Sequence, residues 1–143
     1  ERPIIYDHFV SMPHGPVLSR TYEYMSGDVR SDPEKGWGSW IADIQDHQVR
    51  LRREATRESL DRLSDSDIEV LDFVYSKFGH WNRWDLRDYT HDNCSEWKDP
   101  EGSSLPISYD EILLALGKDA EAAKTITSEI NDHEQIEAMI ARM

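Results

Sequence analysis

Cys94 and His91 are the first pair whose residue types and spacing could support chemistry. A cysteine nucleophile needs a base within hydrogen-bond reach, and a separation of three residues allows that contact. However, no glycines that could build an oxyanion hole flank Cys94, and no third residue is placed to orient the histidine. A free cysteine beside a histidine at a helix end is the more ordinary interpretation. We therefore predict no catalytic residue and no enzymatic activity.

A metal site is the second chemistry that the residue types suggest. Zinc sites in proteins usually join one close pair of His or Cys ligands to a second close pair. Among His47, His80, His91 and Cys94, only the last two are close in sequence. Cys94 is also the one cysteine of the chain, so it cannot form an internal disulfide. We predict no metal site and no cofactor.

Nucleic acid binding is the third chemistry, because residues 65–91 resemble a helix-turn-helix. The second of these helices, expected over Trp84–Thr90, carries Asp85 and Asp88 but only one basic residue, Arg87. Acidic side chains would be repelled by phosphates. We do not expect nucleic acid as a partner, although a DNA-binding transcriptional regulator remains the alternative function.

The charge balance of the chain also argues against nucleic acid as a partner. The chain has 143 residues, with 29 acidic against 16 basic side chains and a net charge of −13. Residues 85–143 hold 14 of the acidic residues and 5 of the basic ones. Such a surface suits a partner with a basic surface, or it serves solubility alone, and both interpretations stay open. No apolar run approaches the roughly 20 residues of a membrane helix and no signal segment opens the chain, so we expect a cytoplasmic protein without a membrane partner.

Aromatic residues supply the large apolar side chains of this polar sequence. Five tryptophans are many for its length, and each is more typical of a core than of a contact surface. Trp81 differs because it stands between His80 and Asn82 in an expected turn. We predict that Trp81 is partly exposed and is the one candidate for partner contact.

The apolar pattern predicts one compact domain over residues 1–143, mainly α (α+β), with about five helices and a small β-hairpin. Capping signals at Ser64 with Asp67 and at Ser108 with Glu111 open two of the helices. A helix over Trp37–Leu51 competes with the hairpin, because its apolar residues also fit a period of 3.6. The expected elements are a β-like piece at Ile4–Tyr6, a helix at Pro16–Ser26, a hairpin at 40–51 with a turn at Gln45–Gln48, helices at 65–78, 84–90 and from Tyr109 to Gly117, a loop at 92–107 anchored by Trp97, and a C-terminal helix within 118–143 interrupted at Asn131–Asp132.

Several short motifs, in this order, resemble the Panacea domain, the SocA-like antitoxin family. Residues 11–19 (SMPHGPVLS) resemble the GPV segment of that family. Thr90-His91 with the later Trp97, and then residues 108–112 (SYDEI), continue the similarity. It is strongest over residues 2–117.

The resemblance implies an antitoxin that binds and neutralises a partner toxin in a two-gene system, without enzymatic activity or cofactor. In one branch of the family the domain instead acts as an adaptor that delivers its toxin to a protease, and that role stays open. Phage and mobile-element proteins also carry the domain. The resemblance does not identify the toxin.

Members of the family usually begin with about two helices before the segment that matches Arg2-Pro3-Ile4, and Glu1 already lies past them. We therefore expect a native product that is longer at its N-terminus. Without those helices, the apolar stripes on 16–26 and 64–78 would be exposed, which promotes self-association.

The residues that carry the resemblance also have a structural interpretation. Gly15-Pro16 suits a helix entry, Thr90-His91 suits side-chain hydrogen bonds at a helix end, and Trp97 suits a loop anchor. We predict that partner contact comes from less patterned surface and that the motif residues are scaffold, namely His14, Gly15, Pro16, Val17, Thr90, His91 and Trp97.

Overall fold

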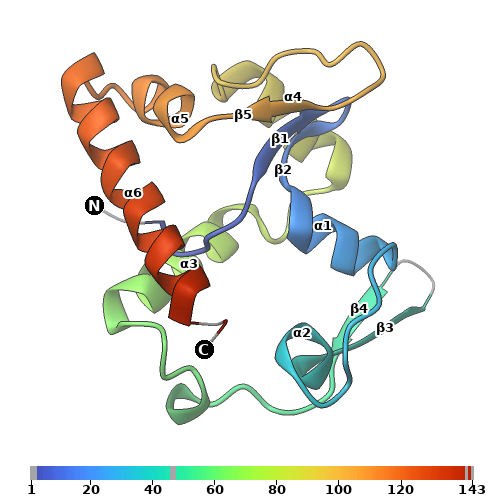
Figure 1. Cartoon of the computed structure of the whole chain (residues 1–143). Coiled ribbons are helices and arrows are strands. Elements are labelled where there is room, and N and C mark those ends of the chain that lie inside the picture. The colour runs from blue at the N-terminus through green and yellow to red at the C-terminus, as the bar shows by residue number, and fades with distance from the viewer. Residues whose placement is uncertain (1–2, 46–47, 141, 143) are drawn as a thin grey trace. The chain divides into compact units, whose positions relative to one another are not determined.

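The computed structural model describes residues 3–45, 48–140 and 142 (Figure 1). The described chain is mainly helical, with six α-helices, one 3₁₀ turn and two small sheets, which confirms the predicted fold class. The elements are β1 (Phe9–Met12), β2 (Gly15–Leu18), α1 (Ser19–Ser26), α2 (Gly36–Trp40), β3 (Ile41–Gln45), β4 (Gln48–Leu51), η1 (Arg57–Ser59), α3 (Asp65–Phe78), α4 (Arg83–Asn93), β5 (Leu105–Ile107), α5 (Tyr109–Ala115) and α6 (Ala120–Ile140).

Contacts between residues divide the chain into two compact units. The first unit combines Glu1–Val17 with Trp81–Met143, and the second is Leu18–His80. A compact unit is not by itself an independently folding domain. The single domain over residues 1–143 therefore stays a prediction.

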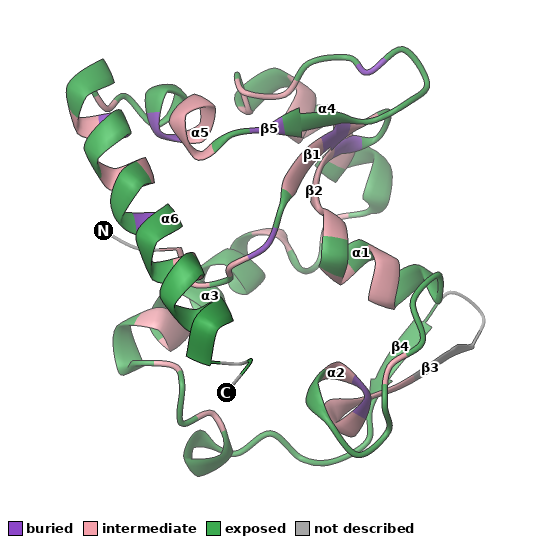
Figure 2. Cartoon of the chain, in the orientation of Figure 1, coloured by how far each residue is buried: buried purple, intermediate pink, exposed green. Residues whose placement is uncertain are grey.

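The first unit holds the buried apolar side chains of the described chain. Its sheet has the order β2-β1-β5, and β1 pairs antiparallel with β5 so that Phe9 faces Ile107 and Ser11 faces Leu105. Helix α5 packs on α6, and the buried positions follow β5, α5 and α6 (Figure 2). These core side chains are Ile107, Leu113, Ala123 and Ile130.

The helices of this unit begin and end where local signals place them. The Ser108 hydroxyl accepts a hydrogen bond from the Glu111 N–H, and the Glu111 carboxylate accepts one from the Ser108 N–H, which confirms the predicted capping box. Helix α6 is continuous, so the predicted interruption at Asn131–Asp132 is wrong. Asn and Asp inside a helix cost only a few tenths of a kcal/mol, so these two residues are not enough to interrupt a 21-residue helix.

In the second unit the two local predictions are confirmed. Strands β3 and β4 form the expected hairpin, with Ile41 opposite Leu51. The competing helical pattern is used only over α2, immediately before β3. The capping box of Ser64 with Asp67 opens α3. Part of the predicted turn at Gln45–Gln48 falls on Asp46 and His47, which lie outside the described residues.

Helix α3 has no buried residue along its whole length (Figure 2). Phe73 is 64% exposed and Tyr75 is 76% exposed. On α1, Tyr22 and Met25 are also exposed. The apolar stripe of α3 is therefore largely exposed, whereas that of 16–26 is exposed only at Tyr22 and Met25, because Val17 and Leu18 are half-buried.

Two predictions near the N-terminus are wrong. Ile4–Tyr6 form no strand, and the first strand is β1. The helix expected over Pro16–Ser26 begins only at Ser19, because Gly15–Leu18 form β2 beside β1. An edge strand such as β2 can hold a proline, because only some of its N–H groups face the neighbouring strand.

Two further boundaries differ from the prediction. Helix α4 covers Arg83–Asn93 rather than the expected 84–90. At its start, the Asn82 side-chain oxygen accepts hydrogen bonds from the N–H groups of Trp84 and Asp85, so the helix begins one residue earlier. The expected loop over 92–107 contains β5, whose three residues are held by pairing with the distant β1. Within the part of the chain that the structure describes, no helix has the length and apolar character to cross a membrane.

Candidate functional site

The motif residues that are far apart in sequence meet in the first unit. Gly15 has a φ of +117°, and a Cβ at this position would lie 2.7 Å from the Oγ1 atom of Thr90. The Thr90 hydroxyl donates a hydrogen bond to the Arg87 carbonyl, 2.8 Å away in the preceding turn of α4. Because only glycine combines this φ with so close an approach, Gly15 brings the start of β2 against α4.

A second contact joins α4 to the loop that follows it. The rings of His91 and Trp97 are stacked, with centroids 3.8 Å apart and planes 16° apart. The Trp97 indole N–H donates to the Met12 carbonyl at 3.0 Å, and the Lys98 N–H donates to the buried Ser11 hydroxyl at 3.1 Å. We call Gly15, Thr90, His91 and Trp97 the motif cluster.

Lys98 extends these contacts to α5. Its ammonium group lies 2.6 Å from the Glu111 carboxylate. The hydrogen bond from Lys98 and the one from the Ser108 backbone lower the pKa of Glu111. One short segment, Trp97-Lys98, therefore links β1, α4 and α5.

The other motif residues lie around the start of β2. Pro16 and Val17 are half-buried within that strand, while His14 is exposed in the two-residue connection before it. The idea that Gly15-Pro16 form a helix entry is thus wrong. Thr90 and His91 lie in the last turn of α4, near the helix end as expected, and the helix itself ends at Asn93. The scaffold role of the motif residues stays a prediction.

Two tryptophans lie near the start of α4, and Trp81 is partly exposed as predicted. Trp81 is half-buried and meets Tyr89 edge to face, with ring centroids 5.4 Å apart. Trp84, which sequence reasoning grouped with the core tryptophans, is 47% exposed. The signal that could have found Trp84 is the pair of arginines that flank it, Arg83 and Arg87.

The geometry does not favour the nucleophile and base considered for Cys94 and His91. Burial, and then the nearby negative charge of Glu96, raise the pKa of the Cys94 thiol, so the reactive thiolate is disfavoured. The His91 ring lies flat on Trp97, and its buried Nε2 atom makes no hydrogen bond among the described residues.

Metal ligation also has no arrangement to build on. In residues 3–45, 48–140 and 142, no three His, Cys, Asp or Glu side chains come together as a metal site would require. His47, one of the residues weighed as a ligand, lies outside the described residues.

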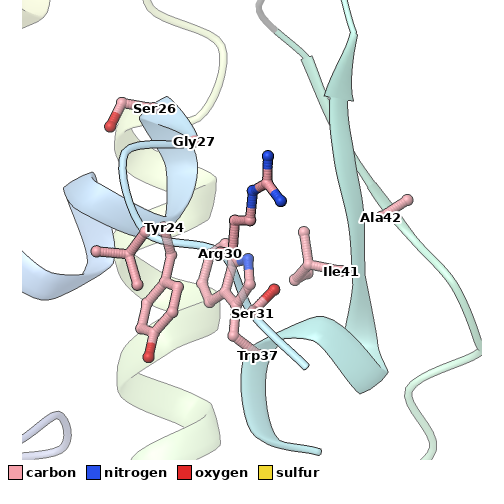
Figure 3. Close-up of a pocket in the computed structure, with 9 residues that line it drawn as sticks. Tyr24, Ser26, Gly27, Arg30, Ser31, Trp37, Ile41 and Ala42 are labelled. Atoms are coloured by element: carbon pink, nitrogen blue, oxygen red, sulfur yellow. The ribbon is translucent and has the colours of Figure 1, made fainter. Parts of the chain in front are cut away.

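The second unit contains a pocket of about 550 Å³ between the end of α1, the following loop, α2 and β3. Tyr24 and Trp37 are stacked on its wall, with ring centroids 5.7 Å apart. In Figure 3 the Arg30 side chain lies between Tyr24 on one side and Ile41 on the other. This lining suits an anionic group on an apolar body, but it includes no residue of the motif cluster.

Comparison with known proteins identifies a family. The family model described as antitoxin SocA-like, Panacea domain, matches residues 1–98. No curated protein and no solved structure matches the chain. The matched residues include the whole motif cluster and all of α4.

Proposed function

The chain belongs to the SocA-like antitoxin family with a Panacea domain, and from this premise we propose that it neutralises a partner protein toxin by binding it directly. The observation that carries the proposal is the family match over residues 1–98, within which the motif cluster is assembled. Antitoxins of this kind need a stable surface rather than a reactive group.

The contacts of the motif residues support a binding role without catalysis. The Trp97 indole N–H donates a hydrogen bond to the Met12 carbonyl, and the His91 ring is stacked on the Trp97 ring. The raised pKa of Cys94 keeps its thiol protonated near neutral pH. We propose that this protein makes and breaks no covalent bond, and that it acts by burying the working surface of the toxin.

Co-expression with the product of the adjacent reading frame tests the proposal. We expect that product to stop growth, the chain to restore growth, and the two proteins to co-purify. Cys94→Ala should restore growth as well as the unchanged chain. A chain that neither restores growth nor binds the product would overturn the proposal, and a Cys94→Ala chain that binds the product but no longer restores growth would overturn its non-enzymatic form.

The level of the toxin during rescue separates the two ways of neutralising it. Direct burial predicts an unchanged amount of toxin on an immunoblot. Delivery to a protease predicts a fall in that amount, which disappears when the host protease genes are deleted. Either result leaves the binding step in place.

The regulator alternative is tested on the same purified chain. Helices α3 and α4, which would form the helix-turn-helix, fall in different units. The antitoxin proposal expects no salt-dependent binding of upstream DNA by the chain alone. A gel-shift titration without the partner measures this directly.

A further inference from the structure

We infer that a surface on α4 and the adjoining connection is the docking hot spot for the toxin, and that the toxin presents an apolar side chain beside a carboxylate there. We call it the α4 surface, and it consists of His14, Arg83, Trp84 and Arg87. The inference rests on the proposed function and adds to it the place of contact and the chemistry of the partner's surface.

Trp84 is the centre of this surface because much of its indole is still open to a partner. It is 47% exposed, whereas the other four tryptophans are half-buried. Tryptophan and arginine are the residue types most enriched among interface hot spots, where a large ring is covered and water is excluded. An apolar side chain of the toxin would cover the part of the Trp84 ring that is exposed to solvent in the chain alone.

Two guanidinium groups lie at the Trp84 ring. The Arg83 and Arg87 carbons at the centre of those groups are 4.6 Å and 5.0 Å from the ring centroid. His14 meets the same ring edge to face, with centroids 6.0 Å apart. A cation held on an aromatic face loses less freedom when a partner binds it, so these groups are prepared for contact.

The two arginines differ in what remains to be bound. Arg87 forms an ion pair with Asp88 at 2.5 Å. Arg83 has no ion pair and no hydrogen bond to a side chain in the described ranges 3–45 and 48–140. The nearby Asp85 already accepts a hydrogen bond from the Asn82 amide at 2.6 Å. A carboxylate of the toxin is the group that would form an ion pair with the Arg83 guanidinium.

The motif cluster packs against the same helix that carries this surface. Gly15 lies against Thr90, one face of α4, and this close approach also holds His14 near Trp84. The stack of His91 on Trp97 holds the last turn of α4 against the following loop. Helix α4 therefore carries residues of both the motif cluster and the α4 surface, and we infer that the first set holds the second in place.

Binding to the toxin encoded by the adjacent reading frame, measured by titration calorimetry and by growth rescue, tests the inference. Trp84→Ala should raise Kd by about 30-fold. Arg83→Glu should raise Kd by about tenfold and more than Arg83→Gln does, because it places a negative charge against a carboxylate. Arg62→Glu, a control with the same change in net charge at an exposed arginine of the second unit, should leave Kd within about twofold.

A second control variant tests whether the loss of any exposed apolar side chain would weaken binding. Met139→Ala removes an apolar side chain that is 64% exposed on α6, a helix that contributes no residue to the α4 surface or to the exposed face of α3, and it should leave Kd unchanged. Far-UV circular dichroism of every variant should match the unchanged chain, because the altered side chains are exposed or half-buried. Tight binding by Trp84→Ala, or a loss of binding by Met139→Ala as large as that by Trp84→Ala, would overturn the docking site, and tighter binding by Arg83→Glu would overturn the carboxylate. In both cases the unchanged chain still binds, whereas failure of the proposed function is recognised by its failure to bind at all.

Discussion

Gly15 and Thr90 approach each other so closely that no side chain fits between them. They are far apart in the sequence, yet a Cβ on Gly15 would lie 2.7 Å from the Thr90 Oγ1 atom and 3.7 Å from its Cβ atom. The φ of Gly15, +117°, is a second constraint that disfavours any other residue. The contact therefore limits how far the start of β2 can lie from α4.

Gly15→Ala is the first predicted change. We expect it to lower the free energy of unfolding by about 2–4 kcal/mol, because it adds both a strained φ and a steric overlap. Urea unfolding followed by circular dichroism measures the loss. Gly117→Ala is the matched control, since Gly117 has a φ of +84° but open space around it. It should cost only about 1 kcal/mol, for the φ alone.

The steric part of that effect can be isolated in a double-mutant cycle. Thr90→Ala removes the Oγ1 atom that the new methyl group would meet. In that background Gly15→Ala should cost at least about 1 kcal/mol less than in the unchanged chain. Equal costs in the two backgrounds would show that the close approach to Thr90 does not constrain this position.

Trp97→Phe is the second predicted change. Phenylalanine can still stack on His91, but it cannot donate the hydrogen bond that the indole makes to the Met12 carbonyl. A partly buried carbonyl would lose its partner, so we expect a loss of about 1–2 kcal/mol in the free energy of unfolding. Trp84→Phe, the control on an exposed tryptophan, should change stability by less than about 0.5 kcal/mol. Equal losses would argue against a special role for the Trp97 N–H.

The local parts of this fold could be predicted from the sequence, because their signals lie within a few residues. Ser64 with Asp67 and Ser108 with Glu111 are capping pairs three residues apart, and both open helices as expected. The alternation around Ile41 likewise found the hairpin. In these places the local pattern and the final structure agree.

The wrong secondary-structure predictions fall where strand pairing with a distant part of the chain determines the structure. Pro16 and Val17 fit the apolar spacing of the following helix, but β1 draws them into an edge strand. Leu105–Ile107 has too few residues for a strand signal and is ordered by its pairing with Phe9–Ser11. Tertiary context outweighs local propensity at such positions.

The candidate site was predicted in its residues but not in its geometry. The motif residues were singled out, yet nothing in their spacing shows that the Trp97 N–H reaches Met12, 85 residues earlier. Exposure is equally a property of the whole fold, which is why Trp81 was chosen as the contact residue while Trp84 is the more exposed.

Glu111 gives the third prediction, a pH dependence. Its pKa is lowered in the folded state by hydrogen bonds from Lys98 and Ser108. The carboxylate therefore contributes stability above its ordinary pKa of 4.5, and this contribution is lost as the pH falls below that value. Glu111→Gln keeps a capping side chain but removes the charge, so it should be less stable than the unchanged chain at pH 7 and should approach it in acid.

Urea midpoints measured from neutral to acid pH provide the test. Glu129→Gln is the control, because this exposed carboxylate makes no hydrogen bond or ion pair within the described ranges. Its difference from the unchanged chain should stay near zero at every pH. A constant difference for Glu111→Gln across the acid range would contradict the role of its charge.

The fourth prediction concerns the exposed apolar side chains of α3. Val70, Phe73 and Val74 are spaced as one helix face, and all three are exposed. Such a face favours self-association of the chain, because pairing would remove apolar area from water. Phe73→Gln should therefore raise the dissociation constant of the self-associated form by about tenfold or more, as measured by sedimentation velocity over a range of concentrations. Asp72→Asn, a change on the acidic side of the same helix, should not weaken association, since it removes a charge and no apolar area. If the unchanged chain sediments as a monomer at every concentration, the α3 face does not drive association.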